Sequence, residues 1–266
     1  MIGAIIGDIV GSRFEFDNYR AKDFELFNKN CIITDDSIMT LAIAKAVMDF
    51  KKYGSNLESK ATIYMQQLGR EYPGYGYGNR FFYWIFSDDP MPYSSYGNGS
   101  AMRVSACGYA ADSQKDAIFM SDTVTGVTHN HIEGLKGARA VADSIFLAKN
   151  GKTKEELKKY ICDNYYKIDF TIDEIRSDYQ FNETCQDTVP QALEAFFESD
   201  SFEDALRTAI SVGGDSDTLA AITCSIAEAY YGVPQDIYNN AVKYLDSSLR
   251  SILEEFEEKY GDNVIR

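Results

Sequence analysis

Residues 211–222 read SVGGDSDTLAAI and place two glycines, then two aspartates and two hydroxyls, directly before an apolar segment. Apolar residues recur at helical spacing from there to Tyr231, so we predict a helix whose first turn holds Asp215, Asp217 and Thr218. Aspartate, serine and threonine favour helix N-termini, where a carboxylate also interacts well with the helix dipole. One such side chain is enough for capping, whereas a second carboxylate repels the first unless a cation binds both.

A second segment of the same character lies at residues 33–47, ITDDSIMTLAIAKAV. There Thr34, Asp35 and Asp36 precede another apolar helix. If the two helix starts face each other, they bring together four carboxylates and two threonine hydroxyls, enough for two divalent ions. Oxygen ligands of this kind favour Mg²⁺, Mn²⁺ or Ca²⁺. Helix capping combined with surface acidity explains the same residues equally well at this level.

A third segment, GAIIGDIVGSRFEF at residues 3–16, has glycines spaced four apart at Gly3, Gly7 and Gly11. This spacing leaves one helical face bare, so that another helix or a ligand can approach closely. Asp8 and Glu15 lie on the same segment. Glu15 is either a general acid–base residue or an ordinary surface glutamate, which is the commoner fate of a lone glutamate.

Helical periodicity dominates the remaining chain, and alternating strand patterns are scarce. The 266 residues contain five prolines and no linker-like stretch, which predicts a single all-α domain over residues 1–266. Helices are expected at 36–52, 57–70, 100–111, 115–126, 133–149, 153–165, 186–198, 202–211, 217–231 and from Pro234 onward. Long connections are expected at 72–99 and around 166–183. The first of these is rich in glycine and tyrosine, so its aromatic rings either stack on a flat ligand or shield the core.

The net charge of −15 argues against duplex nucleic acid as a partner, because such a chain repels phosphate backbones. Five scattered cysteines suit a reducing compartment. Only His129 and His131 are available as imidazole ligands, which makes a histidine-rich zinc or copper site improbable. No apolar run is long enough to cross a bilayer, and the N-terminus has no basic leader, so we expect a cytoplasmic protein.

Five segments occur in an order that resembles the ADP-ribosylglycohydrolases, which include hydrolases of ADP-ribosyl-arginine, ADP-ribosyl-serine and ADP-ribosylated dinitrogenase reductase. They are GDIVGSRFE (7–15), TDDS (34–37), SYGNGSAMRVS (95–105), TH (128–129) and GGDSDTLAAITCSIAEAYYG (213–232). The resemblance spans nearly the whole chain. It implies an all-α single domain with a central metal cleft, and two divalent ions, usually Mg²⁺ or Mn²⁺.

The resemblance also implies roles for individual residues. The metal ligands would be Thr34, Asp35, Asp36, Asp215, Asp217 and Thr218. Glu15 matches a glutamate near the scissile bond, and Glu15, Asp35 or Asp36 would move the protons of the reaction. The loop of Tyr96, Gly97, Asn98 and Gly99 matches one that wraps the diphosphate and the distal ribose, and Ser95 and His129 match positions that line the substrate.

This chain departs from some family members before the glycine loop. They carry a catalytic aspartate shortly before it, whereas Asp88 and Asp89 are too far upstream to match. Tyr93 and Tyr96 are the candidates for stacking on adenine, and only Tyr96 belongs to a matched motif. Arg103 is either a phosphate partner or a structural arginine paired with a carboxylate.

These expectations describe a metal-dependent hydrolase that cleaves the C1″ linkage between ADP-ribose and a protein side chain or small acceptor, releasing ADP-ribose. Its partner would be an ADP-ribosylated protein or a small ADP-ribose conjugate, and the chain would act as a monomer. The alternative is a catalytically silent ADP-ribose-binding protein of the same fold, which would be expected to lose some of the six ligand residues. A histidine-rich phosphohydrolase and a calcium sensor fit less well. The linkage is open between arginine, serine, O-acetyl-ADP-ribose and nucleic-acid ends, with a slight similarity of the loop to the serine type.

Overall fold

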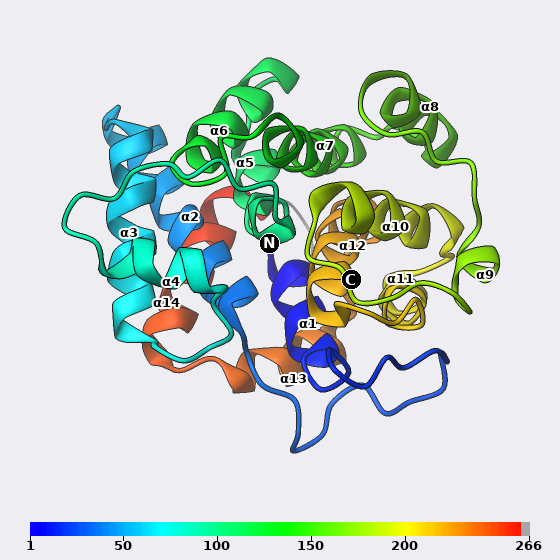
Figure 1. The fold of residues 1–266 in the computed structure, drawn as a ribbon. Helices are drawn as coiled ribbons and strands as arrows, with labels where there is room; N and C mark the ends of the chain where they lie inside the picture. Colours follow the sequence, from blue (N-terminus) through cyan, green and yellow to red (C-terminus); the bar gives the residue numbers. More distant parts are fainter. Residues whose placement is uncertain (262–266) are drawn as a thin grey trace.

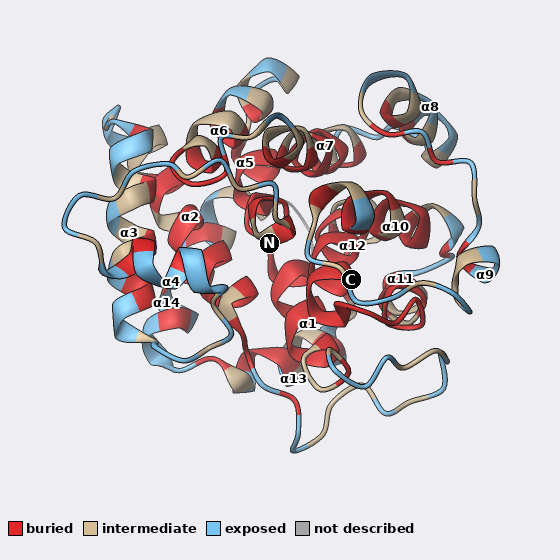
Figure 2. Ribbon diagram, viewed as in Figure 1, coloured by how far each residue is buried: buried red, intermediate tan, exposed pale blue. Residues whose placement is uncertain are grey.

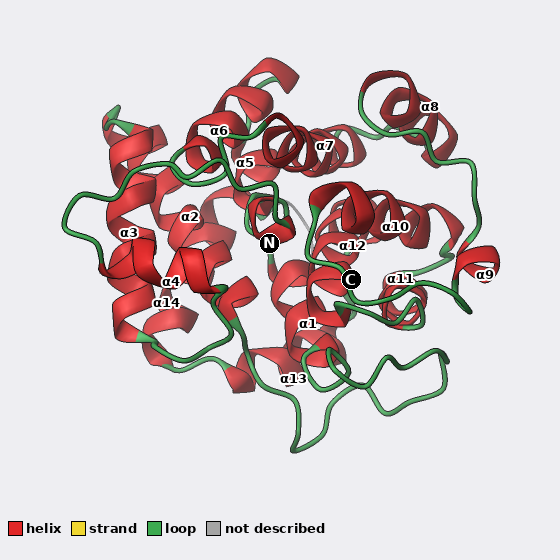
Figure 3. Cartoon of the chain, viewed as in Figure 1, coloured by secondary structure: helices red, strands yellow, loops and turns green. Residues whose placement is uncertain are grey.

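Two helices form the centre of the molecule, α1 (Ile2–Gly11) and α12 (Ser216–Tyr231). Every residue of α1 is buried, as are residues 216–228 of α12 (Figure 2). Both segments are apolar on nearly all sides, which is the composition of a helix enclosed by others rather than one facing solvent. The computed structural model describes residues 1–261, and within that range it contains helices and loops but no strand (Figure 3).

The bare glycine face of α1 packs directly on α12. A Cβ atom on Gly3 would lie 2.2 Å from the carbonyl oxygen of Cys224, and one on Gly7 would lie 2.2 Å from that of Ala220. At the other end, a Cβ on Gly11 would lie 2.5 Å from Cα of Asp217. The two helices are therefore antiparallel and in backbone contact, and the end of α1 meets the start of α12.

The other helices surround this pair (Figure 1). On one side α2 packs on α1, α3 and α14, and on the other side α7, α10 and α11 pack on α12. Their bounds are α2 (Asp35–Tyr53), α3 (Leu57–Glu71), α4 (Asn79–Phe86), α5 (Ser105–Ala110), α6 (Gln114–Gly126), α7 (Ile132–Lys149), α8 (Lys154–Asn164), α9 (Ile172–Ile175), α10 (Cys185–Glu198), α11 (Phe202–Ile210), α13 (Gln235–Ala241) and α14 (Ser247–Tyr260), with 3₁₀ turns η1 (Asn98–Ser100) and η2 (Val242–Tyr244).

The expected all-α fold class is confirmed, but the expectation of an unstructured connection over 72–99 is wrong. Helix α4 forms there because Phe81, Trp84 and Ile85 fall on one helical face and are buried. Ile85 packs against Gly69 of α3, where a Cβ atom would lie 2.7 Å from the Ile85 side chain. The connection at 166–183 also contains one helical turn, α9, which begins with a capping box formed by Thr171 and Glu174.

Two predicted helices are shorter or more divided than expected. The helix expected over 100–111 is the turn η1 followed by α5, which starts only at Ser105. The helix expected from Pro234 onward breaks at Leu245, because the Asp246 side chain accepts hydrogen bonds from the backbone N–H groups of Ser248 and Leu249 and so caps a new helix. None of the helices within residues 1–261 combines the length and apolarity that crossing a membrane requires.

Candidate functional site

The start of α2 is capped without its two aspartates. Thr34 is the N-cap residue, and its hydroxyl accepts a hydrogen bond from the backbone N–H of Asp36 at 3.3 Å. The carboxylate of Asp8, from the middle of α1, accepts the backbone N–H groups of Thr34 at 2.9 Å and Ser37 at 3.0 Å, together with both hydroxyls. The capping of α2 therefore does not use the side chains of Asp35 and Asp36.

The start of α12 also holds a carboxylate that capping does not use, although the other one, Asp217, accepts the backbone N–H of Thr218 at 3.0 Å. Gly213 and Gly214 have φ angles of 82° and 68°, a left-handed conformation that strains other residues, and so the glycine pair makes the turn into the helix. Asp215 occupies the N-cap position, yet its side chain makes no capping hydrogen bond. Its carboxylate instead accepts the side-chain N–H of Asn98 at 2.6 Å.

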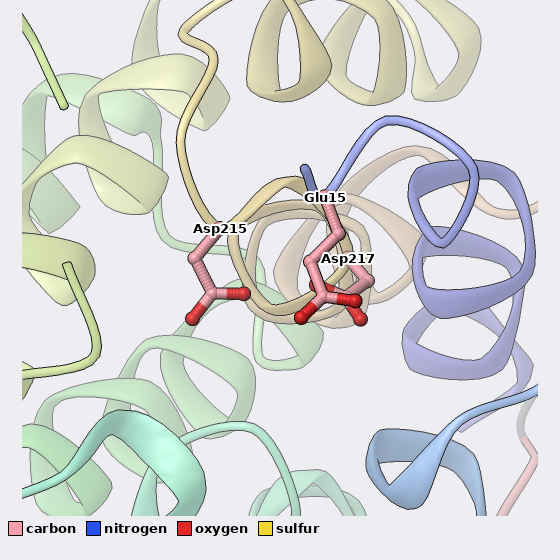
Figure 4. Close-up of side chains that lie close together, drawn as sticks. All are labelled: Glu15, Asp215 and Asp217. Atoms are coloured by element: carbon pink, nitrogen blue, oxygen red, sulfur yellow. The ribbon is translucent and has the colours of Figure 1, made fainter. Parts of the chain in front are cut away.

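The two helix starts meet. The Thr218 hydroxyl donates to Oδ2 of Asp36 at 3.3 Å, a contact between residues 182 positions apart. Carboxylate oxygens of Glu15, Asp215 and Asp217 all lie within 4.8 Å of one another. Figure 4 shows these three carboxylates pointing to the same side, Glu15 from the segment after α1 and the two aspartates from the start of α12. Residues from both ends of the sequence therefore share one acidic site.

Burial and mutual repulsion raise the pKa values of these acids. Burial is the largest cause for each group, followed by the charge of Asp217 for Glu15, Asp35 and Asp36. The pKa of Glu15 rises to about 8, and those of Asp36 and Asp217 rise well above the usual range. Within residues 1–261, no lysine or arginine forms an ion pair with any of them.

The donor set fits a divalent cation. Oδ1 of Asp36 is buried and has no hydrogen-bond partner, so one oxygen of the cluster has an unfilled bonding position. A buried carboxylate oxygen left in this state is costly unless a cation or another donor reaches it. The cluster offers oxygen ligands, which hard cations prefer.

The acidic cluster opens into a cavity of about 650 Å³, a size typical of small-molecule sites. Of the predicted site residues, only Thr34 does not line it, because its hydroxyl donates to Asp8 at 2.7 Å instead. The predicted residues that line the cavity are Glu15, Asp35, Asp36, Ser95, Tyr96, Gly97, Asn98, Gly99, His129, Asp215, Asp217 and Thr218. The roles assigned to them stay predictions.

The glycine loop is held in place by the start of α10. The backbone N–H of Asn98 donates to the carbonyl of Glu183 at 2.7 Å, and that of Cys185 donates to the carbonyl of Tyr96 at 2.9 Å. The Asn98 side chain bridges the Thr188 hydroxyl and Asp215. The loop is thus fixed both to a helix and to the acidic cluster.

His129 is buried and neutral. Burial and then the charges of Arg103 and Arg80 lower its pKa well below 6.5. Arg103 donates to the Thr128 hydroxyl at 2.6 Å, and this hydroxyl lies 2.8 Å from Nδ1 of His129. Because Thr128 already accepts from Arg103, it can donate its proton to Nδ1, which leaves the ring proton on Nε2, beside Gly97 and Gly99.

Several residues in or next to the cavity have no role predicted from the sequence. Asp8 does not line the cavity but holds the start of α2, and a buried acid between apolar residues and glycines was the available signal. Arg80 lines the cavity from α4, and no sequence signal could have found it because α4 itself was not predicted. Phe181 and Glu183 also line it, from the connection before α10.

Of the remaining candidates, two tyrosines line the cavity and the others do not. Tyr93 lines it although it matched no motif, whereas Asp88 and Asp89 do not line it. Tyr96 lines the cavity at its surface, with 46% of the residue exposed. His131 is the N-cap of α7 and accepts the backbone N–H of Glu133.

Comparisons with known proteins identify relatives of one kind. The family model described as ADP-ribosylglycohydrolase matches residues 1–263. The ADP-ribosylhydrolase ARH3 of Xenopus tropicalis is 24% identical over 88% of this chain and 87% of its own. The ADP-ribosylarginine hydrolase Tri1 of Pseudomonas putida (strain GB-1) is 28% identical over 88% of this chain and 70% of its own. A solved structure, described as an ADP-ribosylglycohydrolase-related protein complex, superposes with a TM-score of 0.71 at 20% identity, covering 97% of this chain and 95% of the other.

Proposed function

The chain belongs to the ADP-ribosylglycohydrolase family, whose members are hydrolases of glycosyl bonds, and from this premise we propose a metal-dependent reaction at C1″ of ADP-ribose. The protein would hydrolyse the bond between ADP-ribose and a protein side chain or small acceptor, and would release ADP-ribose. The observation that carries the proposal is that Asp35 and Asp36, which the capping of α2 does not use, lie in one acidic site with Asp215, whose side chain makes no capping hydrogen bond at α12.

The cations would be two Mg²⁺ or Mn²⁺ ions, held by Asp35, Asp36, Asp215, Asp217 and Thr218, with Thr34 contributing its remaining hydroxyl lone pair. When bound, they would balance the carboxylate charge, hold the ribose hydroxyls and make water more acidic. The unpartnered oxygen of Asp36 supports this assignment, as does the absence, within residues 1–261, of an ion pair between these carboxylates and a lysine or arginine.

The chain's own acids would handle charge and protons. Positive charge builds on the sugar in the transition state of glycoside cleavage, and carboxylates facing the cavity stabilise it. Burial and the charges of Asp217 and Asp8 raise the pKa of Glu15 to about 8 in the cation-free cluster, and Glu15 would be the acid that donates a proton to the leaving atom of the acceptor. Asp35 or Asp36 would accept a proton from the attacking water.

The glycine loop would bind the ADP-ribose moiety. A Cβ atom on Gly99 would meet nothing closer than 3.7 Å, so packing within the chain does not require glycine at this position. The open face leaves room for a ligand close to the backbone, next to Nε2 of His129. Ser95 and Tyr96 would complete this wall, and Tyr93 is the better placed of the two tyrosines to lie under a flat ring because it is less exposed.

The acceptor, the compartment and the assembly state belong to the same proposal. One relative is named for ADP-ribosylarginine, another for ADP-ribosyl-[dinitrogen reductase], and others are ADP-ribosylhydrolases without a stated acceptor, so arginine and serine conjugates are both candidates. All five cysteines are free, which suits the cytoplasm. The cavity is built from one chain and needs no second copy, in keeping with a monomer.

The proposal is tested by incubating the protein and Mg²⁺ or Mn²⁺ with ADP-ribosylated arginine and serine peptides and with O-acetyl-ADP-ribose, and detecting free ADP-ribose. We expect turnover of at least one substrate, abolished by chelator and reduced at least about 100-fold in Asp35→Asn and Asp217→Asn. The exposed Asp236→Asn is the matched control and should retain full activity. Tight ADP-ribose binding without turnover would favour the silent binding protein instead.

A further inference from the structure

Two exposed phenylalanines stack on each other beside the acidic site. Phe16 directly follows Glu15 in the chain, and Phe181 lines the cavity from the connection before α10. Their ring centres lie 5.8 Å apart with an angle of 24° between the ring planes, yet 83% of Phe16 and 42% of Phe181 is exposed. The two rings therefore cover each other only in part and leave aromatic surface open next to the cavity.

Polar contacts hold together the segments that carry the two rings. Arg20, in the loop after α1, donates to the carbonyl oxygen of Tyr179 and, at 3.2 Å, to that of Val212. The Asn18 side chain in the same loop accepts the backbone N–H of Gly214 at 2.9 Å. The loop is thus fixed to the connection before α10 and to the turn before α12, and the phenylalanine pair is not the only contact that joins them.

The charge on this side of the cavity is negative. Glu183 lines the cavity and is exposed. Burial is the main cause of the raised pKa values of Glu15 and Asp215, and the charge of Glu183 adds to both, so Glu183 lies near them. Within residues 1–261, Glu183 forms no ion pair with a lysine or arginine. The two arginines that line the cavity, Arg80 and Arg103, make their hydrogen bonds to other parts of the wall.

Open aromatic surface beside an unpaired carboxylate suits a planar cation. The face of an aromatic ring attracts a cation that lies over it. A guanidinium group also stacks on aromatic rings, and its planar fork of donors matches the two oxygens of a carboxylate. A neutral hydroxyl or acyl group uses neither property.

The position of the pair assigns it to the acceptor half of the conjugate. In the proposed reaction Glu15 donates a proton to the leaving atom of the acceptor, so the acceptor lies against Glu15 while the ribose lies at the acidic cluster. Figure 4 shows the carboxylate of Glu15 beside that cluster. Phe16 is the chain neighbour of Glu15, and Phe181 and Glu183 lie in the segment that meets it, so these three side chains adjoin the acceptor.

We infer that Phe16, Phe181 and Glu183 form an acceptor subsite that selects a guanidinium group, so that the substrate is an ADP-ribosyl-arginine conjugate rather than an ADP-ribosyl-serine conjugate. The inference rests on the proposed function, because it takes Glu15 as the proton donor. It does not follow the slight similarity of the glycine loop to the serine type, since that loop would bind the ADP-ribose moiety and not the acceptor.

The test compares kcat/KM on two ADP-ribosylated peptides of the same sequence, one linked through arginine and the other through serine, with Mn²⁺ present. We expect the wild type to prefer the arginine conjugate. Phe16→Leu keeps an apolar side chain but removes the ring, so it should lower kcat/KM for the arginine conjugate about fivefold, mainly by raising KM. Glu183→Gln should act in the same direction. Both variants should change kcat/KM for the serine conjugate by less than about twofold, and Phe16→Tyr, which keeps the ring, should retain the wild-type preference.

Phe119→Leu is the matched control, because Phe119 is an exposed phenylalanine of α6 that does not line the cavity. It should change kcat/KM for neither conjugate. The melting temperature of Phe16→Leu should equal that of the wild type, since the replaced ring is mostly exposed. A lower melting temperature together with an equal loss of kcat/KM on both conjugates would show that the pair only supports the loop, and would overturn the inference.

Other outcomes separate the inference from the proposed reaction. A wild type that prefers the serine conjugate would overturn the inference and leave the proposed hydrolysis intact, as would unchanged kcat/KM of Phe16→Leu on the arginine conjugate. If neither conjugate is hydrolysed, the proposed reaction fails, and calorimetric titration of both conjugates into the same proteins tests the subsite alone. Tighter binding of the arginine conjugate that is lost in Phe16→Leu and Glu183→Gln would support the subsite, whereas equal binding of the two conjugates would overturn it.

Discussion

Asp215 stands at an N-cap position, where an aspartate ordinarily accepts a hydrogen bond from its own helix, and here it does not. Asp36 is similar, because Thr34 and Asp8 already cap α2. The types and positions of these acids could be predicted from sequence, since each motif is local. The part played by Asp8 could not be predicted, because it depends on α1 and the start of α2 being brought together by tertiary packing.

Asp217 provides a test at the scale of one residue. Asp217→Asn removes a buried charge that no basic side chain within residues 1–261 balances, so the metal-free variant should melt a few degrees higher than the wild type in EDTA. Mn²⁺ at a hundredfold excess over its dissociation constant should then stabilise the wild type by about 2.7 kcal/mol and the variant by much less. Thermal unfolding with and without Mn²⁺ measures both effects.

Asp236→Asn, at an exposed position, is the control and should change neither the melting temperature in EDTA nor the stabilisation by Mn²⁺. Equal stabilisation of the wild type and Asp217→Asn by Mn²⁺ would remove Asp217 from the cation site.

Among the elements, α1 and α12 decide where the site lies. Their antiparallel contact brings Glu15 and the start of α12 together, and it depends on the glycine face of α1. The sequence predicted this close approach but left open whether a helix or a ligand made it. The sequence did not reveal α4, because that helix is only eight residues long, is hydrophobic on nearly all sides and lies between glycine-rich and proline-containing segments.

Gly7→Ala tests the helix contact. Its Cβ would lie 2.2 Å from the carbonyl oxygen of Ala220, so the two backbones must separate, and we expect a loss of about 3 kcal/mol in the free energy of unfolding. Gly126→Ala in α6 is the matched control: its Cβ meets nothing within 4 Å, so its stability should stay the same or rise slightly. Urea unfolding measures both, and a Gly7→Ala protein as stable as the control would contradict the packing described here.

Glu257 of α14, which lies away from the acidic site, should make the stability of the fold depend on pH. Burial raises its pKa from 4.5 to about 7, against the lowering effect of the N-terminal ammonium, and Tyr238 donates to its Oε2 at 2.9 Å. Glu257 binds its proton more tightly in the folded protein than in the unfolded chain. Its contribution to the free energy of unfolding is therefore complete below pH 4.5 and is lost as the pH rises through 7.

The glutamine in Glu257→Gln cannot ionise. From about pH 5 to pH 8, the free energy of unfolding of the variant should therefore rise by up to about 2 kcal/mol relative to that of the wild type. Urea unfolding at the two pH values, with Mn²⁺ present to hold the acidic site constant, measures this difference. Exposed Glu258→Gln on the same helix should show no such gain. A pH-independent difference between Glu257→Gln and the wild type would show that Glu257 does not titrate in this range.

At the scale of the whole molecule, the fold brings together acids that are about 200 residues apart in sequence and places two arginines, Arg80 and Arg103, in the lining of the same cavity. The all-α class and membership of the ADP-ribosylglycohydrolase family, both expected from the sequence, are confirmed. The presence of Arg80 in the cavity could not be predicted, because Arg80 belongs to α4, a helix that the sequence did not reveal.

A crystal of the protein soaked in Mn²⁺ and measured at the manganese absorption edge shows whether a cation binds between the two helix starts. We expect anomalous density in the cavity, at coordination distance from the carboxylates of Asp36 and Asp217. Saturating Mn²⁺ with no density between these two helix starts, or density only at other surface acids, would contradict it.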